Sequence, residues 1–310
     1  MRKEKLVVIL GPTATGKSCC GIRLARALNG EIVSGDSMLV YRCMNIGTAK
    51  PSAEELASVP HHLVDILPPD ALFSVVDFKE RAAAAIREIG ERGRLPVLVG
   101  GTGLYLRALL EDYRFSSVTE DSELRLELEK FAKTQGAAAL HNRLQALDPV
   151  AAERLHPNDV RRVIRALETA SAGETVSREK ETEPVYDATV FGLSMERDFL
   201  YERINERVDR MMEQGLEQEV RSLLDRGVPP DALSMKSLGY RQMAEYLAGE
   251  CDLAEAVERI KKGTRHFAKR QITWYKKMPY VRWLPVDRSL NYEKIVADMT
   301  ACLVEKDKKL

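Results

Sequence analysis

The fold of this chain is decided by the stretch Gly11-Pro12-Thr13-Ala14-Thr15-Gly16-Lys17-Ser18, which matches the phosphate-binding pattern G-x-x-x-x-G-K-[S/T] at every fixed position. An apolar run at residues 6–10 precedes it and predicts a buried strand. Residues 19–28 follow, with apolar side chains at helical spacing. Because strand, loop and helix come in the order that the pattern requires, we predict a phosphate-binding loop rather than a plain glycine-rich turn.

The chemistry of this loop depends on four of its residues. Gly11 and Gly16 allow the backbone to direct N–H groups toward an anion. Lys17 offers a positive charge to a terminal phosphate, and Ser18 offers a hydroxyl to Mg²⁺, the one cofactor that we expect. The loop therefore predicts a phosphorylated ligand without choosing the reaction.

The composition is that of a globular protein with a sizeable core: 310 residues, 45% apolar and 30% charged, with a net charge of zero. A nucleic-acid site would therefore need local separation of charge. The five cysteines form no C-x-x-C pair, which favours reduced thiols in the cytoplasm over disulfides or a zinc site. The apolar runs are too short for a signal peptide or a membrane span, so we expect no membrane partner.

Two more predicted strands end in polar segments. Residues 31–35 lead into Asp36, and residues 95–99 lead into Gly100-Gly101-Thr102-Gly103. Since the carboxyl ends of parallel strands share one crevice, both segments should face the phosphate loop. Asp36 is then either a general base or metal partner, or a turn residue that caps the backbone. The glycine-rich segment stands where an ATPase usually places an acidic magnesium ligand, which weighs against ATP hydrolysis.

The chain changes character in its middle. Between residues 115 and 187 strand-like runs disappear and helical periodicity dominates. We predict an all-helical insertion domain there. The remainder, residues 1–114 and 188–310, would form an α/β core with a P-loop NTPase-like parallel sheet and a helical C-terminal part.

The helix predicted at residues 159–170, within this insertion, has two unlike faces. Four apolar residues recur on one face at helical spacing. Arg161 and Arg165 share the other face, with Arg162 beside them. This basic face is either a nucleic-acid contact or simply solvated.

Two later segments are also rich in cations. In the helix predicted at residues 198–213, Arg203 and Arg207 share a face, where acids on the same helix offer simple ion pairs as the bland alternative. Residues 259–277 carry no acid and have three aromatic residues among their cations. Cations for phosphates and rings for bases favour contact with an RNA loop, with a solvated helix as the alternative.

Together these motifs resemble the bacterial tRNA dimethylallyltransferases, in the same order and over nearly the full chain. The segments that carry the resemblance are Gly11–Ser18, Asp36–Arg42, Ile46–Pro51, Gly100–Tyr105, His156–Asp159, Leu238–Gln242 and Lys269–Trp274. The resemblance implies a P-loop α/β core with a helical insertion. It also implies transfer of a dimethylallyl group from its diphosphate to N6 of adenosine 37 of tRNA, the base 3′ to the anticodon, with release of diphosphate. Eukaryotic relatives add a zinc finger, for which this chain has no Cys/His pattern.

The resemblance also implies roles for individual residues. The loop Gly11–Ser18 resembles a diphosphate cradle, with Ser18 near Mg²⁺. Asp36 resembles the base for the adenine amine, Thr102 a partner in placing the reacting groups, and Lys17 and Arg207 the cations at the diphosphate. The residues implied to contact tRNA are Asp36, Ser37, Met38, Leu39, Thr102, Arg125, Arg161, Arg162, Val163, Ile164, Arg165, Lys236, Ser237, Leu238, Gly239, Tyr240, Arg241, Lys269, Arg270, Gln271, Trp274 and Lys276.

Three alternatives share parts of this pattern. A P-loop small-molecule kinase would use the same loop for ATP. A prenyltransferase of free adenine nucleotides would share Lys17, Asp36 and Thr102 but would not need the stretches that match tRNA contacts. A non-catalytic RNA-binding module would bind tRNA without consuming a diphosphate. We expect tRNA with adenosine 37 and dimethylallyl diphosphate as the partners, and a monomer in the cytoplasm.

Overall fold

The computed structural model describes residues 3–113, 115, 122–173 and 184–308. The chain forms two compact units, one made of Met1–Asp112 with Glu181–Leu310 and the other of Tyr113–Lys180. Each unit has a hydrophobic core of its own. Among the described residues, no helix combines the length and the apolar character needed to cross a membrane.

The first unit is built on a six-stranded sheet in the order β3-β2-β4-β1-β5-β6. Its strands are β1 (Lys5–Leu10), β2 (Gly30–Ser34), β3 (His61–His62), β4 (Leu95–Gly100), β5 (Asp187–Met195) and β6 (Val281–Val286). All pairings are parallel, and in the centre Val8 of β1 lies opposite Leu98 of β4 and Val190 of β5. Parallel strands are buried on both faces, which explains why β1 is a continuous apolar run.

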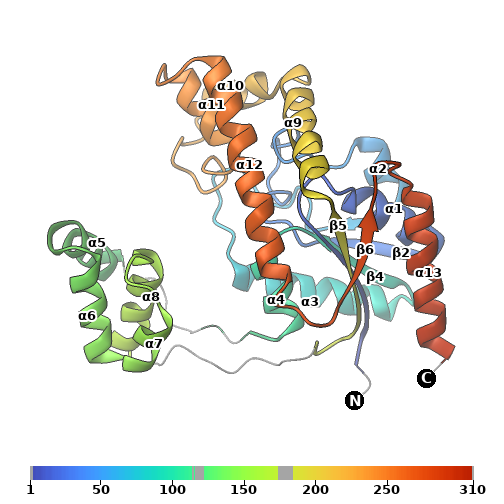
Figure 1. Ribbon diagram of the computed structural model, residues 1–310, viewed down its shortest axis with the longest axis horizontal. Coiled ribbons are helices and arrows are strands. Elements are labelled where there is room, and N and C mark those ends of the chain that lie inside the picture. The colour runs from blue at the N-terminus through green and yellow to red at the C-terminus, as the bar shows by residue number, and fades with distance from the viewer. Residues whose placement is uncertain (1–2, 114, 116–121, 174–183, 309–310) are drawn as a thin grey trace. The chain divides into compact units, whose positions relative to one another are not determined.

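Helices cover both faces of this sheet (Figure 1). On one face, α1 (Lys17–Ala27) and α13 (Tyr292–Lys308) pack against Val7 and Ile9. On the other, Leu6, Val8 and Leu10 join the core with residues of α3 (Val75–Glu91), α4 (Gly103–Leu110) and α12 (Leu253–Tyr275). The alternation of side chains along β1 thus divides the core in two. The remaining helices of this unit are α2 (Ala53–Ser58), α9 (Arg197–Glu213), α10 (Leu216–Asp225) and α11 (Tyr240–Leu247).

Local signals explain where several helices begin. Ser74 caps α3, and its hydroxyl accepts the N–H of Asp77 while the Asp77 carboxylate accepts the N–H of Ser74. After α3 ends, Gly93 has a φ of 70°, a conformation that glycine adopts without strain.

Strand β6 was not predicted from the sequence. Its residues, VRWLPV, are buried only at the two ends of the strand and are exposed or half-buried between them, so they lack the fully buried apolar run of a central strand. Pro285 within it lacks the N–H that a central strand would need. The structure places β6 at the edge of the sheet, paired only with β5, where proline is tolerated.

The second unit is helical throughout its described part. It contains α5 (Ser122–Gln135), α6 (Ala137–Leu147), α7 (Pro149–Arg154) and α8 (Val160–Ser171). Leu140 and Leu144 of α6 pack against Val163, Ile164 and Leu167 of α8. The N–H of Val185 donates to the carbonyl of Leu110 at 2.9 Å, so the chain has rejoined the first unit before β5 begins.

Candidate active site

The phosphate-binding loop connects β1 to α1 and is held by its own hydrogen bonds. The buried hydroxyl of Thr15 and the ammonium of Lys17 both donate to the carbonyl of Pro12, at 2.8 Å each. Gly16 starts α1 with a φ of 88°, and a Cβ there would lie 2.3 Å from the ring of Tyr292. Glycine is therefore required at this position both by conformation and by space.

The ends of β2 and β4 bring Asp36 and Thr102 beside this loop. The two strands approach so closely that a Cβ on Gly100 would lie 2.4 Å from the carbonyl oxygen of Gly35. The Thr102 hydroxyl accepts the N–H of Ser37 at 3.1 Å, and the Thr102 N–H donates to Gly35 at 3.3 Å. Hydrogen bonds thus join Thr102 to the segment that carries Asp36, so the two residues predicted to face the adenine amine are held close together.

Asp36 also caps its own turn. Its Oδ1 accepts the N–H of Met38 at 2.8 Å. This is the structural role that sequence analysis left open as an alternative. The same bond fixes the orientation of the carboxylate, so capping and catalysis are compatible roles for one side chain.

Cations from α9 converge on the loop. Arg203 Nε donates to the carbonyl of Ala14 at 2.9 Å and Arg203 Nη2 to the hydroxyl of Tyr292 at 3.5 Å. Two of the acids that offered simple ion pairs as the alternative have other partners: Glu202 binds Arg288, and Asp209 binds Lys261. Pairing of these two acids with Arg203 and Arg207 therefore does not explain the basic face.

The electrostatics of the site favour an anion. Burial and the nearby charge of Arg207 lower the pKa of Lys17 to about 7, while Asp36 acts in the opposite direction. Burial, Arg210 and Arg203 lower the pKa of Arg207, again opposed by Asp36. These cations outnumber the acid that faces them, so a diphosphate would relieve their mutual repulsion.

The C-terminal part of α12 reaches both loops from below the surface. Gln271 is 4% exposed, and its amide oxygen accepts the N–H of Thr13 at 2.9 Å while its nitrogen donates to Gly101 at 2.7 Å. The buried hydroxyl of Tyr275 donates to the carbonyls of Gly101 at 2.7 Å and Gly11 at 3.3 Å. The Thr13 N–H is therefore engaged by Gln271, and in this structure it is not among the amides directed at an anion.

The sequence indicated neither the internal hydrogen bonds of Gln271 nor those of Tyr275, which the basic composition of this segment had placed among the groups facing RNA. Ala268, Gln271 and Tyr275 are all buried and recur at helical spacing, which marks the inward face of α12. A polar residue on an apolar face is the signal that could have indicated an internal hydrogen-bonding role. The predicted tRNA contacts Lys269 and Arg270 are exposed on the same helix, and Lys276 is exposed directly after its end. Trp274 is half-buried with Arg107 over its ring.

Other predicted tRNA contacts divide in the same way. In the helical unit Arg161 and Arg162 are exposed, whereas Val163 and Ile164 are core residues and present no side chain to a ligand. Arg125 and Arg165 both bind Glu168, whose side chain is fully buried. Its oxygens accept Arg125 Nε and Nη2 at 2.9 Å each and Arg165 Nη1 at 3.2 Å.

A similar division holds for the segment before and within α11. Lys236 and Arg241 are exposed, Ser237 and Leu238 are half-buried, and Gly239 is buried. Tyr240 is fully buried, and its hydroxyl donates to Glu219 of α10 at 2.5 Å. The Tyr240 side chain therefore packs inside the protein, and a contact of this residue with tRNA stays a prediction.

Glu219 joins two of the segments that carried the family resemblance. Besides Tyr240 from the segment 238–242, it accepts the N–H groups of Asn45 and Ile46 and, at 3.2 Å, that of Gly47 from the segment 46–51. Three successive amides turned toward one carboxylate form an anion-binding turn. This acid anchors the loop that follows Asp36, and sequence analysis did not single it out.

A magnesium ion would fit at the start of α1. Ser18 is exposed in the first turn of the helix, where its hydroxyl is accessible. The part of the chain that the structure describes contains no group of three or more His, Cys, Asp and Glu residues able to hold a metal. A single hydroxyl suits Mg²⁺, which takes most of its ligands from phosphate and water in such sites.

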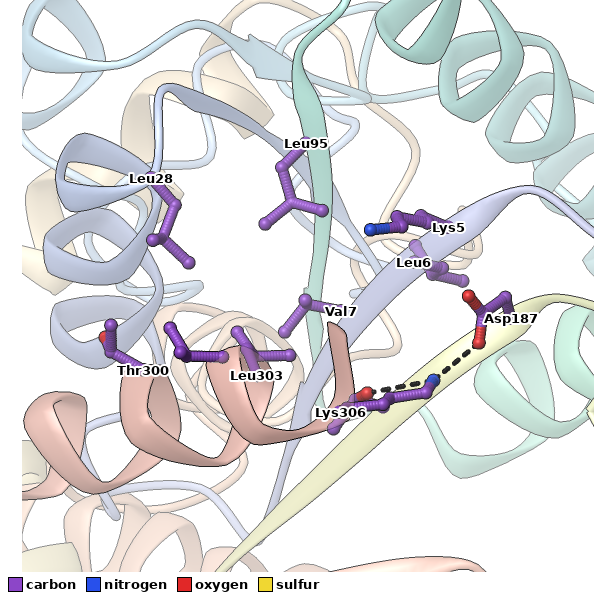
Figure 2. Close-up of a pocket in the computed structure, with 11 residues that line it drawn as sticks. Lys5, Leu6, Val7, Leu28, Leu95, Asp187, Thr300, Leu303 and Lys306 are labelled. Atoms are coloured by element: carbon purple, nitrogen blue, oxygen red, sulfur yellow. Dashed lines mark hydrogen bonds and ion pairs between the residues drawn. The ribbon is translucent and has the colours of Figure 1, made fainter. Parts of the chain in front are cut away.

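A pocket with a volume of about 280 Å³ lies elsewhere, between the starts of β1 and β5 and the end of α13 (Figure 2). Its floor is apolar, with Leu6, Leu95 and Leu303. At its rim Lys306 binds Asp187 at 2.6 Å. It opens at the amino ends of the strands, opposite to the phosphate loop, and none of the predicted site residues lines it.

The parallel sheet, the phosphate-binding loop and the acid at the neighbouring strand end define an α/β protein of the P-loop class, with a site suited to an anion. The chain belongs to the IPP transferase family, whose model matches residues 39–278. It is 48% identical over 302 residues to a tRNA dimethylallyltransferase of Halalkalibacterium halodurans, with 96% of each chain covered. It is 52% identical over 286 residues to one of Desulforudis audaxviator, with 91% of this chain and 92% of the relative covered.

Solved structures agree with this assignment. The full-length tRNA isopentenylpyrophosphate transferase of Bacillus halodurans matches with a TM-score of 0.74 and 47% identity, covering 99% of both chains. A eukaryotic dimethylallyltransferase acting on tRNA matches with a TM-score of 0.81 and 28% identity, covering 98% of this chain and 79% of the other. The fold class and the family expected from the sequence are confirmed.

Proposed function

We propose that this protein transfers a dimethylallyl group from dimethylallyl diphosphate to N6 of adenosine 37 in tRNA and releases diphosphate. The observation that carries the proposal is the convergence of Lys17, Arg207, Asp36 and Thr102 at the carboxyl end of the sheet. This arrangement combines an anion site with a base, in a chain whose full-length relatives are named tRNA dimethylallyltransferases.

The reaction breaks the bond between the allylic carbon and the diphosphate oxygen and forms a bond from that carbon to N6. The leaving group keeps the electron pair, so negative charge grows on it in the transition state. Lys17 and Arg207 would stabilise this charge, and a bound Mg²⁺ would add to the stabilisation. Because their own repulsion is relieved by an anion, both cations are suited to this task.

Asp36 would hold the adenine amine and accept its proton. The amine is a weak nucleophile, because its lone pair is delocalised into the ring. Thr102, whose hydroxyl accepts the N–H of Ser37, would help to keep the adenine amine aligned with the carboxylate of Asp36. With the turn cap from Met38, Asp36 is oriented before substrate arrives.

The tRNA must present its base outside the stacked anticodon loop, which requires a few kcal/mol of unstacking energy. Exposed cations on α8 and α12 would offset this energy through phosphate contacts, foremost Arg161, Arg162, Lys269 and Arg270. Arg125 and Arg165 would contribute from a shared, fixed position. We further propose that the protein acts as a monomer in the cytoplasm, consistent with five free cysteines.

A direct test incubates the purified protein with Mg²⁺, dimethylallyl diphosphate and unmodified tRNA, with AMP and ATP as parallel acceptors. Mass spectrometry of the digested nucleosides should show the dimethylallyl mass on adenosine 37 alone. Product on free nucleotide only, or phosphate transfer from ATP, would replace the proposal with one of its rivals. Tight tRNA binding with no product would leave a binding protein.

A further inference from the structure

Two residues of α12 each contact both of the loops that line the site. Gln271 accepts from Thr13 of the phosphate loop at 2.9 Å and donates to Gly101 at 2.7 Å. Tyr275, one turn later, donates to Gly101 at 2.7 Å and to Gly11 at 3.3 Å. Residues four apart lie on one side of a helix, so together they form a double bridge between the two loops.

These contacts are internal. Gln271 is 4% exposed and Tyr275 is fully buried, so water does not compete for their hydrogen bonds. The bridge leaves little room: a Cβ on Gly101 would lie 2.7 Å from the nitrogen of Gln271 and 3.8 Å from Cε of Lys17. A buried amide whose donor and acceptor are both used fixes distance as well as direction.

The bridged loops hold the two halves of the reaction. The phosphate loop carries Lys17, at the leaving group, and the segment after β4 carries Thr102, at the acceptor. Bond formation and bond breaking depend on the separation between these halves, and a displacement of about 1 Å is expected to lower the rate about 100-fold.

We propose that Gln271 is a positioning residue that, with Tyr275, sets the spacing between the diphosphate loop and the acceptor-side loop. The inference rests on the proposed transfer reaction. It replaces a direct tRNA contact for the Gln271 side chain with an effect on the chemical step. The exposed neighbours Lys269 and Arg270 keep the role of tRNA contacts.

The variant Gln271→Glu tests this role through its pH dependence. A protonated glutamic acid can accept from Thr13 and donate to Gly101 as the amide does, whereas a carboxylate would face the Gly101 carbonyl without a proton. Burial and the negative charge of Asp36 disfavour the carboxylate of the variant, whereas the positive charge of Lys17 favours it. The hydroxyl of Tyr275 is a further polar neighbour of this side chain. The ratio of variant to wild-type kcat should therefore fall as pH rises.

The measurement is kcat, KM for each substrate and tRNA affinity between pH 5.5 and 8.5, with melting temperatures at each pH. We expect kcat to be lowered about 10- to 100-fold at the high end and to recover toward wild type at the low end, with tRNA affinity unchanged. Gln218→Glu, an exposed site on α10, is the matched control and should give a ratio near one.

The outcomes are separable. A wild-type protein without transferase activity would refute the proposed function. An active wild type with Gln271→Glu equal to it at every pH, or impaired to the same extent at every pH, would overturn the positioning role, as would a loss confined to tRNA affinity. If Gln271→Glu does not fold, Tyr275→Phe removes one oxygen from the same bridge and should lower kcat with both KM values nearly unchanged.

Discussion

The helices α8 and α12 are alike on the outside and different on the inside. Both expose cations that are expected to contact tRNA. In α8 the buried acid is Glu168, which binds the guanidinium groups of Arg125 and Arg165. In α12 it is Gln271, which binds the main chain of two loops. The charged Glu168 thus holds charged side chains in place, whereas the neutral Gln271 holds main-chain groups in place.

This difference predicts two kinds of defect. Changes inside α12 should appear in kcat, because they displace the reacting groups. Changes inside α8 should appear in tRNA affinity, because they disturb the arginines that we propose contact the nucleic acid.

The largest effect is expected at Asp36 and defines what lost chemistry looks like. Asp36→Asn keeps an oxygen that can accept the Met38 N–H but cannot take a proton from the adenine amine. We expect kcat to fall about 10²- to 10⁴-fold with tRNA affinity unchanged. Single-turnover kinetics and filter binding would measure both. Near-normal turnover in this variant would show that capping is the only role of Asp36. The loss of kcat in the α12 variants could then no longer be compared with the loss caused by removing the base.

The next effect concerns protein stability and distinguishes the phosphate-binding loop, which α12 contacts, from the cluster of Glu168, Arg125 and Arg165 at α8. The pKa of Lys17 is lowered from 10.5 to about 7, so the unfolded chain binds more protons between these values. The destabilisation from Lys17 is thus complete below about pH 7 and disappears as pH approaches 10.5. Lys17→Met should raise the melting temperature by several degrees at pH 6 and by less at pH 9.5.

Lys269→Met, exposed on α12, is the control for this measurement and should show no pH-dependent gain. A Lys17→Met variant that melts lower than wild type at pH 6 would contradict the charge strain assigned to the loop. Diphosphate should remove the strain in the wild type, so its addition should raise the melting temperature more for wild type than for the variant.

A smaller effect is expected in α8. Glu168→Ala frees Arg125 and Arg165 from their common partner, and the two cations would then repel each other across a buried gap. We expect KM for tRNA to rise about 10-fold, which corresponds to about 1.4 kcal/mol, with kcat within about twofold of wild type. Steady-state kinetics in the two substrates would check this. A fall in kcat at constant KM would erase the distinction between the two helices.

The smallest effect concerns the outer faces, where α8 and α12 should not differ. Arg161→Gln and Arg270→Gln each remove one exposed cation. Each should reduce the slope of log K against log salt by about one and weaken binding across all tRNA sequences. Fluorescence titrations between about 50 and 200 mM salt would measure the slopes. An unchanged slope for either variant would remove that arginine from the tRNA surface.

The sequence predicted the parts of this molecule that depend on local pattern. The phosphate loop, the central strands and the helical character of the second unit follow from fixed spacing and apolar periodicity. The edge strand β6 was missed, because a strand at the edge of a sheet can have an exposed middle and a proline. Where a strand is only partly buried, its apolar and polar positions differ too little for the strand to be recognised from sequence.

The site was predicted less evenly. Asp36 and Thr102 come just after the ends of β2 and β4, and Lys17 comes at the end of the loop that follows β1, so the topology of a parallel sheet brings them together. The partners of Gln271, and the three amides that bind Glu219, lie far away in the chain and are main-chain groups, which every residue possesses. Contacts of this kind leave no side-chain pattern to detect. Val163 and Ile164 show the converse, since their apolar periodicity had already placed them on the inner face of α8.

The position of β1 has a consequence for the order in which this protein folds during synthesis. Its neighbours in the sheet are β4 on one side and β5 on the other, and the whole helical unit lies between those two strands in the chain. The helical unit has local contacts and its own core, so it can fold while β1 still has one open edge. That edge is a template for wrong pairing until Asp187–Met195 has left the ribosome. The length of the helical unit thus determines the delay, during synthesis, between formation of β1 and its pairing with β5.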